Sequence, residues 1–319
     1  MSRKKMLYHW MVAGMLFSAG QLHAQTQPLF DQYQFNQMIF NPAYCGSRQA
    51  LETSFFLHRQ SVRMDGAPST ESLTAHMPLF NDKVGLGIKA FHDNIGVTNK
   101  EYFAIDYAYR MHLNNDLVFS IGLEGSITNY NVRYTDLEAY ATGDPAFSGN
   151  ESFWVPNAGA GIYFAGAKYY IGLSSLGLLA QDAYTGEIPD TSVVSFEQIR
   201  HIYLTTGFLI DITDKVALKP SFLLKLSEYT PAQLDANLGV VFNNTFMLGG
   251  GYRTNGSVSV TGEYILHAGN GIKDHEFGLG YSFNTMLGNA STYFGPSHEV
   301  YIVYRFYNQH PDIKNPRFF

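Results

Sequence analysis

The residues best suited to chemistry are scattered through this sequence rather than grouped. It contains eleven histidines and a single cysteine, Cys45. Metal sites and Ser–His–Asp sites combine such residues in recognisable constellations. No such spacing occurs among the histidines on predicted strands, which are His76, His92, His112, His201 and His298. We therefore expect no enzymatic activity, no metal and no cofactor, and Cys45, which has no partner for an internal disulfide, is interpreted as a small apolar residue.

Three charged residues form the local arrangement that merits most attention. Asp106 and Arg110 are four residues apart and share the polar face of one predicted strand, and Glu124 lies on the polar face of the next. Acid–base catalysis by these groups has no further support in the sequence. Whether the three side chains meet depends on the strands that carry them.

Those strands are marked by apolar and polar residues that alternate with period two. Between Glu101 and Leu113, the odd-numbered positions carry large apolar side chains and the even-numbered positions carry Ala104, Asp106, Ala108, Arg110 and His112. The same pattern predicts fourteen strands, near residues 50–60, 69–79, 83–93, 100–113, 116–129, 153–165, 167–179, 198–211, 214–226, 232–242, 245–253, 256–267, 272–283 and 297–308.

The number and length of these strands predict an all-β fold, a transmembrane antiparallel β-barrel over residues 49–308. A soluble sandwich also alternates, but each strand here is about long enough to cross a bilayer at a tilt, and their number is even. In lipid an open sheet edge leaves backbone groups unpaired at several kcal/mol each, so the sheet must close. A basic side chain facing lipid costs about 2–4 kcal/mol at mid-membrane. We therefore expect Asp106, Arg110 and Glu124 to form an ion-pair network in the lumen.

Connection lengths predict how the barrel sits in the membrane. Connections after even-numbered strands are short, whereas 130–152, 180–197 and 284–296, after odd-numbered strands, are long. This alternation is typical of an outer-membrane barrel with both termini in the periplasm. The short connection at Thr254-Asn255 breaks the rule. We accordingly expect the tail, residues 309–319, to be periplasmic.

The start of the chain predicts export. Arg3, Lys4 and Lys5 precede an apolar stretch, and small or apolar residues lead up to Ala24, so residues 1–24 are interpreted as a signal peptide. After Ala24 no apolar run reaches the roughly 20 residues of a spanning helix. The net charge of −6, without a basic block, gives no support for nucleic-acid binding.

Residues 25–48, between the signal peptide and the first strand, do not alternate. They mix aromatic residues with amides, which leaves two interpretations open: a periplasmic extension, or a short plug that enters the lumen and places its amides against the polar wall. The residues proposed to contact a partner or to form the plug are Phe30, Gln32, Tyr33, Phe35, Asn36, Asn41, Pro42 and Tyr44.

The same segment resembles the start of the PorP/SprF family of outer-membrane proteins, found with the type IX secretion system of Bacteroidetes. That family opens with a Phe–Gln–Tyr cluster that runs into Asn-Pro-Ala-Tyr-x-Gly-Ser, here Asn41 to Ser47. Further matches follow in order at Asp65–Pro68, Asp144–Phe147, Leu218–Ser221 and Ser297–Glu299. Two features depart from the family pattern: Cys45 stands where alanine is common, and no aromatic residue follows Arg59-Gln60.

The resemblance implies a helper role rather than chemistry. Members of the family take part in type IX export and gliding motility. The expected partners are a secreted surface adhesin, whose export or surface retention the barrel would support, the periplasmic and outer-membrane components of the machine, and the lipid bilayer. The alternative is a transporter of hydrophobic small molecules, because fourteen-stranded barrels of that kind carry an N-terminal hatch with Asn-Pro-Ala, as in residues 41–43. A diffusion porin is a third candidate.

Overall fold

The computed structural model describes residues 30–114, 116–136, 150–179, 181–188, 192–228, 230–269 and 274–307. The predicted signal peptide, the first residues of the mature chain and the C-terminal tail lie outside this range. No helix within the described residues has the length and apolar character needed to span a membrane.

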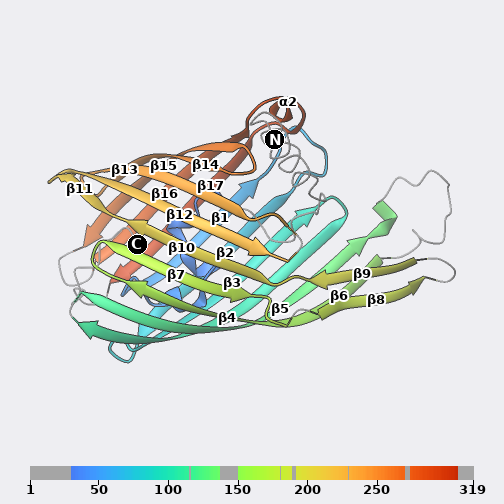
Figure 1. Cartoon of the computed structure of the whole chain (residues 1–319), viewed down its shortest axis with the longest axis horizontal. Helices are drawn as coiled ribbons and strands as arrows, with labels where there is room; N and C mark the ends of the chain where they lie inside the picture. The colour runs from blue at the N-terminus through green and yellow to red at the C-terminus, as the bar shows by residue number, and fades with distance from the viewer. Residues whose placement is uncertain are drawn as a thin grey trace, which may run out of the picture.

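The main sheet contains strands that neighbour one another in sequence order (Figure 1). They are β1 (Leu51–Arg59), β2 (Ser69–Leu79), β3 (Val84–Ile95), β4 (Thr98–Asn114), β5 (Leu117–Arg133), β6 (Asn150–Ala165), β7 (Tyr169–Leu176), β10 (His201–Phe208), β11 (Ile210–Thr213), β12 (Val216–Ser227), β13 (Gln233–Phe242), β14 (Phe246–Arg253), β15 (Ser257–Gly269), β16 (Asp274–Met286) and β17 (Ser297–Tyr307). A separate pair consists of β8 (Gln181–Ile188) and β9 (Ser192–Gln198). The helical elements are η1 (Tyr33–Phe35), η2 (Gln37–Ile39), η3 (Pro42–Tyr44), η4 (Tyr134–Asp136) and α2 (Ala290–Phe294).

The sheet closes on itself as a β-barrel. The first strand, β1, pairs antiparallel with the last, β17, from Leu51 opposite Phe306 to Arg59 opposite His298. On the other side of the ring, β10 pairs with both β7 and β12. Strands β10 and β11 both pair with β12 and are separated by one residue, so together they form a single interrupted strand of the wall. The fifteen assigned strands therefore make a barrel of fourteen strands. The predicted fold class, an antiparallel barrel of about fourteen strands, is confirmed.

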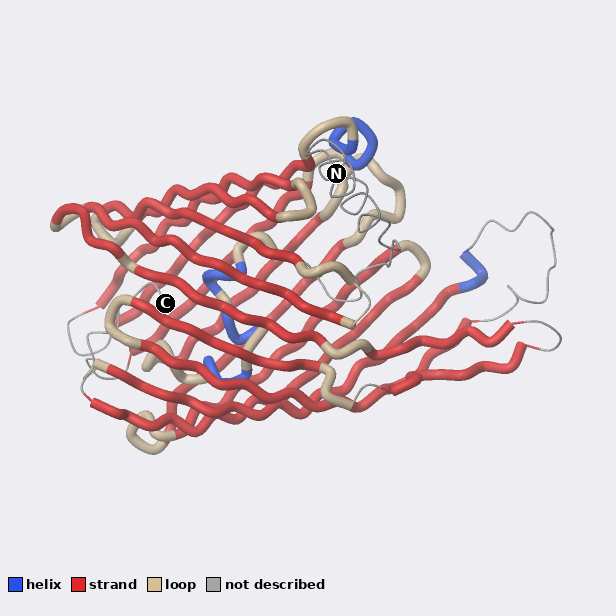
Figure 2. The backbone as a smooth tube through the Cα atoms, in the orientation of Figure 1, coloured by secondary structure: helices blue, strands red, loops and turns tan. Residues whose placement is uncertain are grey.

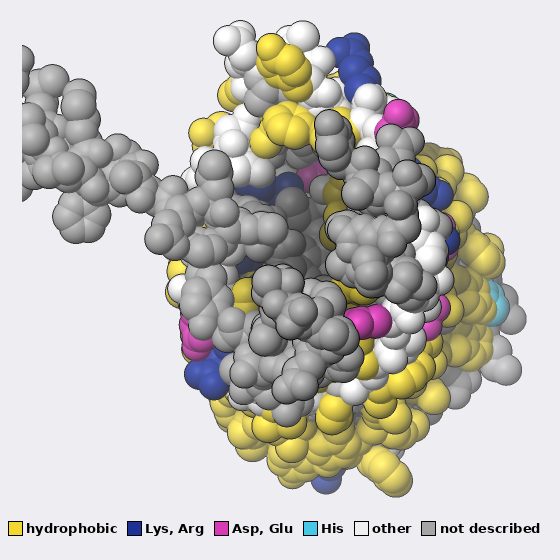
Figure 3. Space-filling view, turned by 90° about the vertical axis from the view of Figure 1, so that its right-hand side faces the viewer, with side chains coloured by type: hydrophobic (Ala, Val, Ile, Leu, Met, Phe, Trp, Pro, Cys, Tyr) yellow, Lys and Arg dark blue, Asp and Glu magenta, His cyan; other side chains and the backbone are white. Residues whose placement is uncertain are grey.

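The alternation in the sequence separates the two faces of the wall. In β4, Ile105 is 66% exposed on the outside whereas its neighbour Asp106 is fully buried on the inside. The same pattern along β1 turns Glu52, Ser54 and His58 inward. Figure 3 shows that hydrophobic side chains cover the outer wall visible from one end of the barrel. This arrangement matches a lipid-facing exterior around a polar interior.

The two ends of the barrel differ in their connections. At one end, called the short-turn end, β4 and β5 are separated by residues 115–116 and β11 and β12 by residues 214–215. The opposite, long-connection end carries residues 60–68, 134–149, 177–200 and 287–296. Two connections at this second end are nonetheless short. The sequence predicted a short connection between β14 and β15, where the structure has three residues. It did not predict the two-residue connection between β3 and β4, because both strands continue further than their alternation indicates.

A hairpin occupies the stretch 180–197, for which the sequence indicated only a long connection. Its strands β8 and β9 pair antiparallel from Gln181 opposite Gln198 to Ile188 opposite Ser192. Figure 1 shows this hairpin extending from the barrel beside β5 and β6, which are also long strands. The long-connection end is therefore built partly from extended β-structure.

Candidate functional site in the barrel lumen

The N-terminal segment, residues 30–50, lies inside the barrel. Every residue from Phe30 to Arg48 is buried. Its three short helices η1, η2 and η3 are visible within the ring of strands in Figure 2. The segment contacts inward-facing residues on strands from all around the wall, including Thr74 of β2, Ser174 of β7 and Ser221 of β12. It therefore fills space that would otherwise belong to a lumen.

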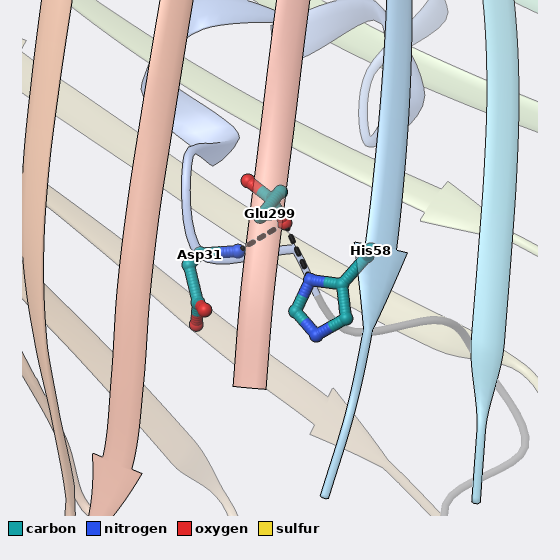
Figure 4. A group of neighbouring side chains, drawn as sticks. All are labelled: Asp31, His58 and Glu299. Carbon is teal, nitrogen blue, oxygen red and sulfur yellow. Dashed lines mark hydrogen bonds and ion pairs between the residues drawn. The ribbon is translucent and has the colours of Figure 1, made fainter. Parts of the chain in front are cut away.

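The segment begins at an anchor formed by Glu299 of β17. Both oxygens of its carboxylate accept hydrogen bonds from backbone N–H groups: that of Asp31 at 2.9 Å and that of Gln32 at 2.8 Å. The ring nitrogen Nδ1 of His58 lies 2.6 Å from the same carboxylate (Figure 4). The side chain of Asp31 in turn accepts one hydrogen bond from Asn284 and contacts Arg253 at 3.3 Å. A buried carboxylate that satisfies two backbone donors fixes the chain at this point.

Asp31, His58 and Glu299 also satisfy the simplest geometric condition for a metal site. One potential ligand atom from each lies within 4.8 Å of the others, and no other group of three such residues within the described part of the chain has this arrangement. However, both oxygens of Glu299 already accept hydrogen bonds, and the carboxylate of Asp31 accepts one from the side-chain amide of Asn284. The guanidinium of Arg253 would also repel a cation. We therefore interpret the group as an anchor for the segment.

Asn41 and Pro42 organise the middle of the segment. The side-chain oxygen of Asn41 accepts the N–H of Ala43 at 2.9 Å and so caps η3, which has Pro42 at its first position. The side-chain amide of Asn41 donates to the carbonyl of Ile162 in β6 at 2.9 Å. One asparagine thus fixes both the local turn and its position on the wall.

Glycines in the wall allow the segment to approach the strands closely. A Cβ added to Gly122 of β5 would lie 2.2 Å from the backbone nitrogen of Ala43, and one on Gly161 of β6 would lie 2.2 Å from the side-chain oxygen of Asn41. A Cβ on Gly85 of β3 would lie 2.0 Å from the carbonyl oxygen of Cys45. Each distance is far shorter than a van der Waals contact, so these positions require glycine.

The other residues singled out in the sequence also contact the wall. Asn36 donates to Thr74 at 2.7 Å, and the side chain of Gln32 donates to the carbonyl of Glu299 at 3.3 Å. Four aromatic residues pack against aromatic or polar partners: Phe30 on Phe56, Phe35 stacked on Tyr301, Tyr44 edge-on to His76 and Tyr163, and Tyr33 with its hydroxyl bonded to Ser221. The amide and aromatic composition of the segment is thus matched by the polar, aromatic inner wall.

The proposed charge network differs from its sequence-based prediction in one member. Asp106 and Glu124 do share a cation, but it is Lys89 of β3, whose ammonium lies 3.0 Å from Asp106 and contacts Glu124. Arg110 instead pairs with Asp82, in the turn between β2 and β3, at 3.7 Å. The alternation along β3 could have indicated Lys89 as the cation, because Gly85, Gly87 and Lys89 share the inward face of this strand.

Lys89 also connects this network to the N-terminal segment. Its ammonium donates to the carbonyl of Met38 at 3.2 Å. The hydroxyl of Tyr102 donates to the other carboxylate oxygen of Glu124 at 2.5 Å. Lys89, Asp106 and Glu124 are buried, so each depends on the others for its polar contacts, and Lys89 also depends on the segment.

A second network, which the sequence reasoning missed, lies at the seam that closes the barrel. Arg305 of β17 contacts Glu52 of β1 at 2.5 Å, and Glu52 also lies within 3.3 Å of His76 and 3.5 Å of Arg48. Arg305 further lies 3.6 Å from Glu276 of β16. The network thus ties the first and last strands to the end of the N-terminal segment. Its members are far apart in sequence, so spacing alone carries no signal for it.

Cys45 is buried within the same segment. The sequence-based interpretation as a small apolar residue is consistent with this environment.

Comparisons with known proteins place this barrel in a family. Residues 22–304 match the family described as "Type IX secretion system membrane protein PorP/SprF". The chain belongs to the PorP/SprF family. This confirms the resemblance inferred from the sequence motifs. A search of curated proteins gave no match.

Solved structures with a similar fold are barrels with low sequence identity to this PorP/SprF protein. They include the CymD monoaromatic hydrocarbon channel (13% identity, 88% of this chain and 93% of that chain, TM-score 0.48) and the toluene transporter TodX of Pseudomonas putida (12%, 86% and 93%, 0.43). A third is the outer membrane protein Omp33 of Acinetobacter baumannii (8%, 81% and 98%, 0.42). These similarities concern the barrel alone and do not indicate what the PorP/SprF protein binds. Family and fold together identify an outer-membrane β-barrel of the type IX secretion system.

Proposed function

We propose that this PorP/SprF protein is a non-enzymatic accessory of type IX secretion that supports the export or surface retention of a partner adhesin. One observation carries the proposal beyond family membership: the interior is occupied by a buried segment with extensive contacts to the wall. A filled barrel is suited to bind partners at its two ends and unsuited to conduct a polypeptide. We accordingly propose that residues 25–48 act as a plug, with residues 49–308 as the barrel and 309–319 as a periplasmic tail.

The two ends offer different surfaces to partners. The long connections and the β8–β9 hairpin are proposed to face the cell exterior and to contact the secreted client. The short turns are proposed to face the periplasm, where they and the tail would meet other components of the secretion machine. The outer wall, with its exposed Leu, Ile and Phe side chains, is proposed to face lipid.

A deletion strain tests the proposal against the transporter alternative. We expect the surface proteome of the strain to lose one or a few large secreted proteins, which accumulate in the periplasm or the medium, while uptake of toluene and long-chain fatty acids stays unchanged. Complementation with the wild-type gene should restore surface display. An unchanged surface proteome together with a loss of hydrophobic uptake would contradict the proposal and favour the transporter.

A further inference from the structure

The start of the N-terminal segment lies at the long-connection end of the barrel. Asp31 bonds to Glu299, the third residue of β17, and to Asn284, close to the end of β16. The carbonyl of Phe30 accepts a hydrogen bond at 3.2 Å from Arg253, the last residue of β14. All three partner positions border connections of the long-connection end.

The end of the segment lies at the opposite, short-turn end. The carbonyl of Cys45 packs against Gly85, the second residue of β3, and Arg48 pairs with Glu52, the second residue of β1. Between these two points the chain runs through the barrel along its length, with Asn36 on β2 and Asn41 on β6. The segment therefore enters the barrel at one end and joins β1 at the other.

From this path we infer that the N-terminus of the mature chain emerges at the long-connection end, on the opposite side of the membrane from the end of β17. The sequence predicts that the mature chain starts at Gln25, five residues before Phe30. Five residues span at most about 17 Å, whereas the apolar band of such a barrel is about 25 Å tall. Residues 25–29 therefore cannot return to the short-turn end.

This inference revises the expectation that both termini lie in the periplasm. The end of β17 at Tyr307 lies at the short-turn end, so the periplasmic position proposed for the C-terminal tail is retained. The N-terminus, in contrast, joins the face that carries α2 and the connection between β1 and β2. On the proposed orientation it adds a short polypeptide tip to the surface offered to an extracellular partner. The inference does not depend on which partner that is.

Cysteine labelling on intact cells tests the position of the tip. The introduced cysteines are Pro28→Cys, Val62→Cys in the connection between β1 and β2, and Lys168→Cys in the turn between β6 and β7, each in a Cys45→Ala chain. Val62 is exposed at the long-connection end and Lys168 at the short-turn end. A membrane-impermeant maleimide is applied before and after permeabilisation of the outer membrane, and labelling in denaturant shows that each thiol is present.

We expect Pro28→Cys to be labelled under the same condition as Val62→Cys, and Lys168→Cys under the opposite condition. The comparison is internal, so it holds whichever end of the barrel faces the exterior. Heat-dependent mobility on gels shows which variants are folded, and only folded barrels are compared. Labelling of Pro28→Cys that follows Lys168→Cys would overturn the inference. So would a Pro28→Cys thiol that stays unlabelled in both conditions while it reacts in denaturant.

Discussion

At the residue scale, buried charges hold the lumen together. Lys89 forms ion pairs with Asp106 and Glu124, and Arg305 joins Glu52 to Glu276. Removing one partner of a buried ion pair leaves the other charge uncompensated and typically costs about 3–5 kcal/mol. Exposed pairs contribute only about 0–1 kcal/mol. The barrel contains both kinds, which allows matched comparisons.

The first prediction concerns Lys89. Lys89→Met removes the cation shared by Asp106 and Glu124, so we expect the free energy of unfolding to fall by about 3–5 kcal/mol. Urea-dependent unfolding in phospholipid vesicles measures this difference. The control is Lys168→Met, which removes an exposed ion pair with Asp211 and should change stability by less than about 1 kcal/mol. Equal losses in the two variants would contradict the role assigned to Lys89.

The second prediction concerns Glu299. Glu299→Ala leaves the backbone N–H groups of Asp31 and Gln32 without their acceptor, and each buried unsatisfied donor costs about 1–3 kcal/mol. We expect a loss of stability and faster proteolysis within residues 30–36 of the folded barrel. Glu71→Ala is the matched control, because Glu71 is a half-exposed glutamate on β2. If proteolysis of the segment were the same in both variants, Glu299 would not be its anchor.

At the element scale, the close approaches between the segment and the wall require glycine, whereas other glycines are tolerant. Gly122 faces Ala43 on the inside of β5, whereas Gly125, three residues later, has no atom within 4 Å of an added Cβ. We predict that Gly122→Val displaces the segment and that Gly125→Val does not. Sensitivity of cells to vancomycin, which the intact outer membrane excludes, reports the difference. Equal sensitivity in the two strains would argue against a tight contact at Gly122.

The strands could be predicted from the sequence because alternation is a local signal. The alternation predicts all fourteen strands of the barrel, and most predicted strand ends lie within a few residues of the ends in the structure. The partner of Asp106 and Glu124 could not be found in the same way, because it depends on how the strands are paired. Lys89 lies opposite Ala104 in β4, which is two residues from Asp106 along the same strand. The ion pair between Glu52 and Arg305 forms only when the barrel closes and β1 pairs with β17. In the β8–β9 hairpin, the alternation of apolar and polar residues extends over too few residues to distinguish its strands from a loop.

At the scale of the whole molecule, we propose that the N-terminal segment fills the lumen of the barrel as a plug. Contacts from Glu299 at one end to Glu52 at the other distribute the segment along the barrel. A secretion accessory of this form would act through the surfaces at its two ends, in agreement with the family to which it belongs. We infer that the barrel is closed to passage.

Single-channel recording in planar lipid bilayers tests that claim most directly. The purified wild-type barrel should give no steady conductance, whereas Gly122→Val, which displaces the segment, should give a measurable open-channel current. Gly125→Val serves as the folded control and should remain silent. A stable conductance from the wild-type protein, equal to that of Gly122→Val, would contradict the account, because it would show that the segment does not close the lumen.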